Sequence, residues 1–205
     1  REHDCRRSQS RKNPLRPYRD RVMTGPRGNQ TGGPPVVSVI GLKDSGKTSV
    51  AVGLISALER RGRHVMAIKH GHRFEIDTPS TDSWRLRHEG GAHRVVLAGP
   101  EDMVVMGGWG AEGELPLDEL VHRFVSDADI VVVEGYKNAD VPKIEVHRPA
   151  AHAKPIYRPD LPGAERFLAL VTDALEMHLP IPLLDLNAPD LSDRLADLVE
   201  SSLLS

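Results

Sequence analysis

The chain has 205 residues, of which 39% are hydrophobic and 27% are charged, the balance of a globular protein with its own core. Its single cysteine, Cys5, excludes an internal disulfide and a cysteine-rich zinc site, and 4% aromatic residues leave little surface for stacking bases. No apolar run approaches the roughly 20 residues of a membrane span. We therefore expect a cytoplasmic protein that uses neither a membrane nor nucleic acid as a partner.

The net charge of -2 conceals a basic N-terminal segment. Residues 1–33 contain nine basic and three acidic residues, which leaves 18 basic and 26 acidic residues for the rest. Residues 1–35 are rich in Arg, Ser, Gln, Asn, Gly and Pro, so we expect a disordered basic leader and linker. Either this segment is an unselected extension, with Met23 as the true start, or it is a transit-like or nucleic-acid-binding tail.

Strands and helices alternate over residues 36–205, which we expect to form one domain. The predicted elements, in chain order, are strand 36–40, helix 47–61 ended by Gly62, strand 65–68, helix 82–90 capped by Thr81 or Asp82, a hairpin of strands 95–98 and 103–106, helix 116–126, strand 130–133, alternating strand 143–146, a proline-rich loop 149–163, strand 167–171, extended piece 181–186 and helix 190–204. This order predicts an α/β fold, a three-layer α/β/α sandwich with a mostly parallel sheet and a small antiparallel pair.

Residues 41–48, Gly-Leu-Lys-Asp-Ser-Gly-Lys-Thr, fit the phosphate-binding pattern G-x-x-x-x-G-K-[ST] between a strand and a helix. Gly41 allows a sharp turn, and Gly46 lets the backbone N–H groups approach phosphate oxygens. Lys47 supplies a point charge for the phosphates, and the Thr48 hydroxyl is a hard donor of the kind Mg²⁺ prefers. The loop predicts a P-loop NTPase domain. Its remaining predicted nucleotide contacts are Lys43, Asp44, Ser45 and Ser49.

A P-loop needs an acidic partner for Mg²⁺ or its water. Glu134 follows the apolar run 130–133, and a carboxylate at the carboxyl end of a parallel strand faces the same crevice as the loop. We predict Glu134 as a metal ligand and, with Lys47, as a catalytic residue; the alternative is a surface charge at a strand end. Asp77 is a second candidate metal ligand, or else a turn former.

Several other residues leave alternatives open. Asp173 follows strand 167–171 and either reads guanine N1 and N2 or caps the next turn. The Lys69, His70 and His72 cluster is an anion contact, a metal pair or a solvated loop. Lys137 and Lys143 are phosphate or pterin contacts, or else surface lysines. No arginine in the crevice loops is obviously placed to act as a finger in cis.

Six segments occur in an order that resembles a known family. They are residues 37–48, Ile-Lys-His-Gly-His at 68–72, Phe-Glu-Ile-Asp at 74–77, Asp-Ser-Trp-Arg at 82–85, Val-Glu-Gly-Tyr-Lys at 133–137 and Pro-Lys-Ile-Glu-Val at 142–146. Over about residues 36–199 the chain resembles the MobB family, accessory proteins of molybdopterin-guanine dinucleotide biosynthesis. Ser80 and Thr81 stand where that family usually has Gly and Lys.

The resemblance implies a GTP-binding protein with weak GTPase activity, usually a homodimer. It also implies action with a MobA-type guanylyltransferase, which attaches GMP to molybdopterin, and molybdopterin as a bound substrate. Two other function classes fit a P-loop. A small-molecule kinase needs an arginine-rich lid, and the only dense arginine run precedes the P-loop. A metallochaperone GTPase needs a Cys or His motif, and Cys5 stands alone outside the domain.

Overall fold

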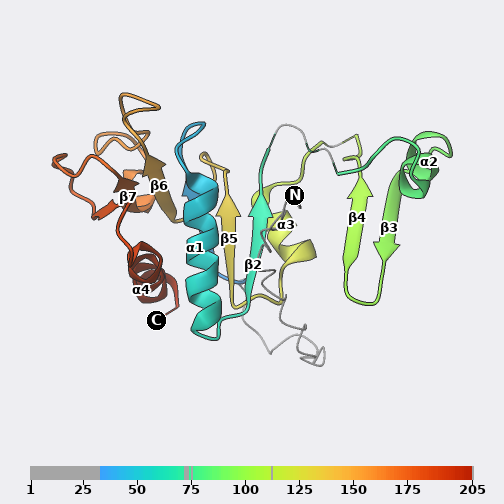
Figure 1. Ribbon diagram of the computed structural model, residues 1–205, viewed down its shortest axis with the longest axis horizontal. Coiled ribbons are helices and arrows are strands. Elements are labelled where there is room, and N and C mark those ends of the chain that lie inside the picture. The colour runs from blue at the N-terminus through green and yellow to red at the C-terminus, as the bar shows by residue number, and fades with distance from the viewer. Residues whose placement is uncertain (1–32, 72–73, 75, 112, 205) are drawn as a thin grey trace, which may run out of the picture. The chain divides into compact units, whose positions relative to one another are not determined.

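The computed structural model describes residues 33–71, 74, 76–111 and 113–204. The predicted leader lies outside this range except for residues 33–35. Six strands form one parallel sheet in the order β2-β5-β1-β6-β7-β8 (Figure 1). They are β1 (Val36–Ile40), β2 (Val65–Lys69), β5 (Ile130–Glu134), β6 (Lys143–His147), β7 (Phe167–Thr172) and β8 (Leu183–Asp185).

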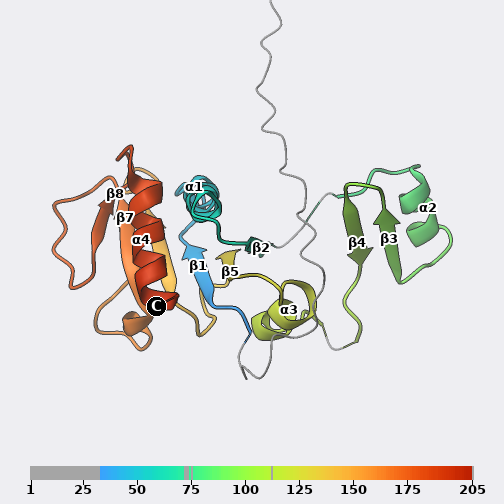
Figure 2. The same ribbon diagram turned by 90° about the horizontal axis from the view of Figure 1, so that it is seen from below.

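Helices cover both faces of this sheet. Helices α1 (Lys47–Arg60) and α4 (Leu191–Leu203) lie on one face and α3 (Leu117–Phe124) lies on the other (Figure 2). The alternation of β5 explains how one strand serves both layers, since successive side chains point to opposite faces. Ile130 and Val132 join the cluster formed with α1 and α4, whereas Val131 and Val133 pack with α3.

A second, two-stranded sheet carries the remaining helix. Strands β3 (Arg94–Ala98) and β4 (Met103–Gly107) pair antiparallel, and Gly99 N–H donates to the Asp102 carbonyl at 2.9 Å to close the turn. Helix α2 (Asp82–His88) packs on β3 and begins after Thr81, whose hydroxyl accepts from Trp84 N–H at 3.3 Å. The hairpin and the Thr81 cap are both as predicted.

The predicted fold class is confirmed: a mostly parallel sheet between helical layers, with a separate antiparallel pair. Gly62 adopts a left-handed φ of 84° directly after Arg61, the C-cap residue of α1, and is the predicted helix stop. The predicted alternating strand 143–146 is present as β6, and all five residues of β6 are buried because it lies between β1 and β7. None of the described helices combines the length and apolar character needed to span a membrane.

Candidate functional site

The P-loop joins β1 to α1 at the carboxyl edge of the parallel sheet, the blue segment above α1 in Figure 1. Two register pairs bring charged side chains to the same edge. Glu134, the last residue of β5, lies opposite Val39 of β1 and opposite Lys69 of β2. The crevice outside the carboxyl ends of parallel strands is where open α/β sheets bind their ligands. The topology therefore places Glu134 and Lys69 beside the P-loop.

Both predicted glycines of the P-loop are required by its geometry. Gly41 has a φ of 153°, and a β-carbon there would lie 2.3 Å from the Val146 carbonyl oxygen. Gly46 has a φ of 94° and immediately precedes the first residue of α1. Neither position accepts a larger residue without strain. The loop can therefore keep its backbone exposed toward a ligand at the start of α1, where N–H groups favour an anion.

Two polar side chains of the loop suit a phosphate group. The Lys47 ammonium donates to the Leu42 carbonyl at 2.7 Å and so spans the loop from its far end. The Ser45 hydroxyl is buried and has no hydrogen-bond partner. A buried unpaired hydroxyl carries a free-energy cost unless a ligand supplies its partner. The loop thus contains a lysine ammonium and a hydroxyl without a hydrogen-bond partner, and both groups can bind a phosphate oxygen.

Glu134 lies in direct contact with the P-loop helix. The Thr48 hydroxyl donates to one Glu134 carboxylate oxygen at 2.9 Å, and the Lys69 ammonium contacts the other at 2.5 Å. Burial raises the pKa of Glu134, but the hydrogen bonds from Lys69 and Thr48 outweigh this effect and hold the pKa below the ordinary value for a glutamate. Glu134 therefore stays ionised at neutral pH.

The Thr48 and Glu134 oxygens fit Mg²⁺. This ion is usually held by one or two carboxylates together with phosphate oxygens and waters, rather than by an all-protein cage. The described residues include no cluster of three or more His, Cys, Asp or Glu side chains that could hold a metal ion. Among the predicted metal ligands, the structure brings Thr48 and Glu134 together.

Asp77, the second predicted metal ligand, has its hydrogen-bond partners in a local turn. One of its carboxylate oxygens accepts from Thr78 N–H at 3.0 Å, from the Thr81 hydroxyl at 2.9 Å and from the Ser83 hydroxyl at 3.0 Å. No contact among the described residues joins Asp77 to Thr48 or Glu134. These bonds order the start of α2, which is the turn-former alternative.

The other predicted nucleotide contacts differ in position. Lys43 and Asp44 are exposed on the P-loop, and Asp44 has a left-handed φ of 62°. Ser49 is exposed in the first turn of α1. Asp173 directly follows β7 and is exposed at the same edge of the sheet, two strands away from β1. Its predicted contact with guanine stays a prediction.

Several lysines and histidines have structural partners. The Lys143 ammonium is buried and donates to the Ala139 and Val141 carbonyls at 2.5 and 2.9 Å, so it is not a surface lysine. The His70 ring lies 4.5 Å from that of Tyr136, whose hydroxyl donates to Glu114 at 2.8 Å. His72 lies outside the described residues.

The segment after β6 supplies two residues that the sequence analysis did not identify. The His152 ring donates from Nε2 to the Lys43 carbonyl of the P-loop at 2.7 Å. The Arg148 guanidinium lies 3.9 Å from the position that a β-carbon of Gly46 would occupy. An arginine of a crevice loop therefore lies near the P-loop, and the expectation that none acts as a finger in cis stays a prediction. The available signal was that Arg148 immediately follows a strand, but the pairing of that strand with β1 is a long-range feature.

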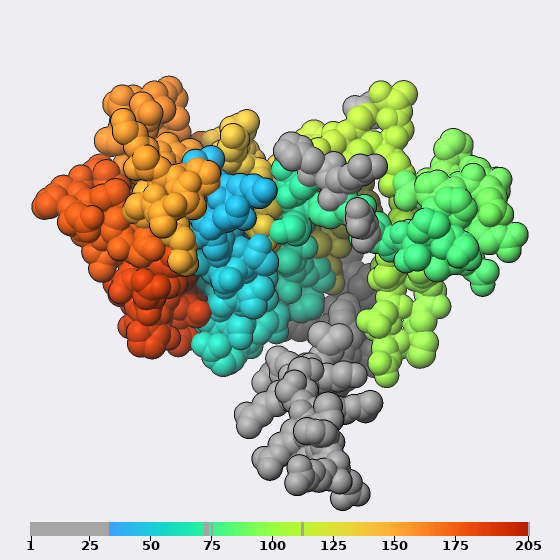
Figure 3. Space-filling model, turned by 45° about the horizontal axis from the view of Figure 1, so that its top comes forward, coloured from blue at the N-terminus to red at the C-terminus, as the bar shows by residue number. Residues whose placement is uncertain are grey.

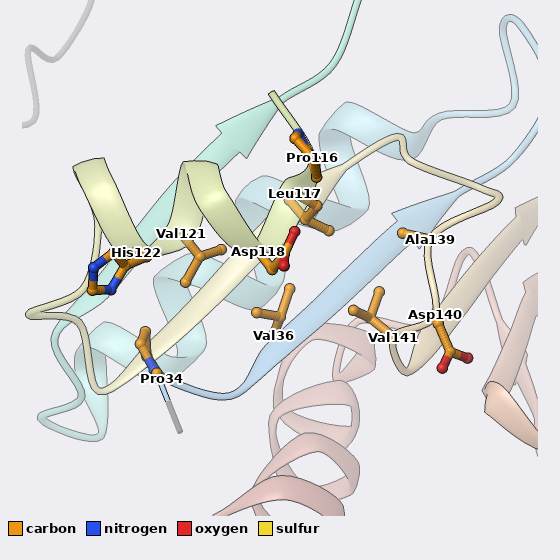
Figure 4. A pocket seen from close by; sticks show the side chains of 11 residues that line it. Pro34, Val36, Pro116, Leu117, Asp118, Val121, His122, Ala139, Asp140 and Val141 are labelled. Carbon is orange, nitrogen blue, oxygen red and sulfur yellow. The ribbon is translucent and has the colours of Figure 1, made fainter. Parts of the chain in front are cut away.

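A pocket among the described residues lies away from this site. A cavity of about 480 Å³ is bounded by α3, by the start of β1 and by the loop before β6 (Figure 4). It contacts Pro34 and Val36, at the opposite end of β1 from the P-loop. Leu117 and Val121 of α3 give it an apolar wall. No residue of the P-loop lines this cavity.

Comparisons with known proteins agree with this geometry. A family model described as MobB, molybdopterin guanine dinucleotide synthesis protein B, matches residues 36–173. The chain is 34% identical over 164 residues to the molybdopterin-guanine dinucleotide biosynthesis adapter protein of Haemophilus influenzae, covering 78% of this chain and 86% of that protein. The corresponding adapter protein of Escherichia coli K12 is 32% identical over 155 residues, which are 75% of this chain and 86% of that protein.

Solved structures show the same relationship. The crystal structure of molybdopterin-guanine biosynthesis protein B matches with a TM-score of 0.60 and 26% identity, covering 83% of this chain and 99% of that chain. A MobB homologue from Bacillus stearothermophilus has the same fold, with a TM-score of 0.57 and 22% identity over 82% of this chain and 97% of that one. With its P-loop, its Glu134 contact and these relatives, the chain belongs to the MobB family.

Proposed function

We propose that the protein is a GTP-binding accessory factor of molybdenum-cofactor biosynthesis that acts in the cytoplasm. In this proposal it assists a MobA-type guanylyltransferase, which attaches GMP to molybdopterin, and it hydrolyses GTP weakly on its own. The observation that carries the proposal is the contact between the Thr48 hydroxyl and the Glu134 carboxylate, next to the unpaired Ser45 hydroxyl. The adapter proteins of Haemophilus influenzae and Escherichia coli support the pathway.

Each residue of the site has a defined task in this proposal. The loop N–H groups and the Ser45 hydroxyl bind phosphate oxygens, and Lys47 exchanges the Leu42 carbonyl for the phosphates. Thr48 and Glu134 hold Mg²⁺, which neutralises phosphate charge when it is bound. The Lys69 ammonium forms an ion pair with the Glu134 carboxylate and partly neutralises its charge. Asp173 accepts from guanine N1 and N2, a donor pair that adenine lacks.

Molybdopterin is the second ligand in this proposal. Lys69 and His70 follow one another at the end of β2, on the crevice side of the sheet. Their side chains are only partly buried, with exposed fractions of 55% and 36%. They supply donors for the phosphate of a pterin placed next to the nucleotide.

A homodimer completes the proposal, and the β3–β4 sheet supports it. Val96, Val105 and Met103 share one face of this sheet and are 56%, 41% and 71% exposed. An isolated two-stranded sheet is marginally stable, and an exposed apolar face marks an interaction site. We expect a second copy to cover this face.

Val96→Lys should therefore give a monomer in light scattering, whereas Val52→Lys, at an exposed position of α1, should leave the dimer unchanged. A dimeric Val96→Lys protein would contradict this interface.

The pathway assignment is tested by binding and by reconstitution. Purified protein should bind GTP at least tenfold more tightly than ATP and should turn GTP over at about 10⁻² s⁻¹ or slower, the range of P-loop GTPases without a partner in trans. Added to a MobA-type transferase, it should increase the yield of guanine dinucleotide cofactor, identified by mass. Turnover above about 1 s⁻¹ with a small-molecule acceptor would favour a kinase instead.

A further inference from the structure

Arg148 is brought to the P-loop by the pairing of two strands that lie far apart in the sequence. Strand β6 runs parallel to β1, with Val39 opposite Ile144 and Ile40 opposite Glu145. Gly41 and Arg148 each follow the end of one of these strands. The two chains are also in close contact here, since a β-carbon on Gly41 would collide with the Val146 carbonyl. The residue after β6 therefore emerges at the edge where the phosphate-binding loop begins.

The segment that carries Arg148 is fixed to the P-loop by histidines. His152 donates from Nε2 to the Lys43 carbonyl at 2.7 Å, and His147 donates from Nε2 to the His152 carbonyl at 2.9 Å. A carbonyl only accepts, so both rings carry their proton on Nε2 in these bonds. His147 is buried at the end of β6, which anchors the connection in the sheet. In Figure 3 the blue atoms of the P-loop region reach the surface beside the orange atoms of this segment.

The Arg148 guanidinium is aimed at the phosphate-binding end of the loop. Its terminal nitrogen lies 3.9 Å from the β-carbon position of Gly46, the residue directly before α1. No carboxylate in the described part of the chain forms an ion pair with Arg148. An arginine presents a planar fork of donors that matches phosphate oxygens, and such charge-assisted bonds are among the strongest in proteins. The Arg148 guanidinium therefore has both the position and the available N–H donors to bind a phosphate at Gly46.

We propose that Arg148 binds the phosphate chain of the nucleotide from the β6 side of the P-loop, opposite Glu134 on the β5 side. This inference rests on the proposed function, because it requires a nucleotide on the P-loop. Lys47, Arg148 and Mg²⁺ would then divide the phosphate charge among them. The His147–His152 connection is the positioning device, since it couples the segment that carries Arg148 to the loop backbone.

The test compares two arginines of the same loop by calorimetric titration with GTP and with GDP. We expect Arg148→Ala to weaken binding of both nucleotides by about 10- to 100-fold, and Arg148→Lys to recover part of the loss because it keeps the charge without the fork. Arg158 is exposed on the same segment, so Arg158→Ala should change both affinities less than twofold. The salt dependence of binding should become shallower in Arg148→Ala only, because one phosphate contact is lost.

Two controls separate this proposal from the function on which it rests. Thermal melting of each variant checks folding, and Arg148→Lys remains informative if Arg148→Ala is unstable. GTP and GDP affinities within twofold of wild type in Arg148→Ala, alongside loss of binding in Lys47→Ala, would overturn the role of Arg148 and leave the P-loop assignment standing. Unchanged binding in Lys47→Ala as well would overturn the proposed nucleotide site itself.

Discussion

Asp44 is the one residue of the P-loop whose charge opposes an anionic ligand. It is exposed, it occupies a left-handed φ of 62°, and it lies two residues before Gly46. Asn tolerates the same backbone region, so Asp44→Asn removes the charge without adding strain. Two unit charges of the same sign that lie 4 Å apart in water repel each other with an energy of about 1 kcal/mol. We expect Asp44→Asn to bind GTP about threefold more tightly at low salt, with the difference shrinking at 0.5 M salt; equal affinity at both salt concentrations would contradict this.

Glu134 is expected to act on hydrolysis more than on nucleotide binding. Its carboxylate accepts from Thr48 and Lys69, and Glu134→Gln keeps the shape of the side chain while removing the charge. Binding of GTP without Mg²⁺ should therefore be nearly unchanged, and Mg²⁺-dependent turnover should fall by about 10²-fold or more. If Glu134 is only a strand-end charge, turnover stays at the wild-type value and only the melting temperature changes.

The same carboxylate predicts a pH dependence of stability. The hydrogen bonds from Lys69 and Thr48 hold the pKa of Glu134 below the ordinary value for a glutamate in the folded protein, despite the opposing effect of burial. An acid whose pKa is depressed by folding stabilises the fold above its unfolded pKa and loses that contribution as pH falls through its folded pKa. Wild type should therefore melt above Glu134→Gln at pH 6, and this gap in melting temperature should narrow as the pH falls through the range in which Glu134 becomes protonated. A gap that is constant or widens on acidification would contradict the assignment.

Strand β6 shows how a polar pattern can belong to a core. Glu145 is buried, and its two carboxylate oxygens accept from Ile156 N–H at 2.5 Å and from Tyr157 N–H at 2.7 Å. Burial raises the pKa of this carboxyl, while the two backbone donors and His147 lower it in part. Lys143 is satisfied in the same way by two carbonyls. The polar residues of β6 thus tie neighbouring loops to the sheet.

Removing Glu145 should therefore destabilise the proline-rich loop that it anchors. Glu145→Ala leaves two N–H groups without their acceptor, and each costs about 1–3 kcal/mol of stability. The variant also removes the free-energy cost of burying the Glu145 carboxyl, which offsets part of this loss. We expect a net loss of about 2 kcal/mol or more in the free energy of unfolding by denaturant titration. Glu176→Ala, at an exposed loop position, is the matched control and should stay within about 0.5 kcal/mol of wild type. A similarly small loss in Glu145→Ala would contradict the anchoring role.

Elements defined by local signals were predictable, and those defined by pairing were not. The apolar runs of β1 and β5, the glycine stop of α1 and the Thr81 cap of α2 all depend on neighbouring residues, and each lies where the sequence predicts it. The burial of β6 depends on its place between β1 and β7. The approach of Arg148 to Gly46 depends on the same pairing. Sequence patterns predict the P-loop and Glu134 but not the β6 side of the site.

Across the described domain, the charged residues of the proposed nucleotide site lie at one edge of the parallel sheet. In strand order, this edge carries Lys69, Glu134, the P-loop, Arg148 and Asp173. The arrangement follows from the parallel topology, since every strand delivers its last residue to the same crevice. The β3–β4 sheet, with its exposed apolar face, carries none of these residues. The proposed nucleotide site and the proposed dimer contact are therefore separate surfaces, and variants of one should leave the other unchanged.

The most direct test of this account is the affinity of the protein for GTP with and without the P-loop lysine. Lys47 is only partly buried and contacts the loop through a single carbonyl, so Lys47→Ala should keep the fold and the melting temperature close to wild type. By calorimetry in the presence of Mg²⁺, we expect wild type to bind GTP and Lys47→Ala to lose measurable binding. Equal GTP affinity in the two proteins would contradict the P-loop assignment, and with it the function proposed for this member of the MobB family.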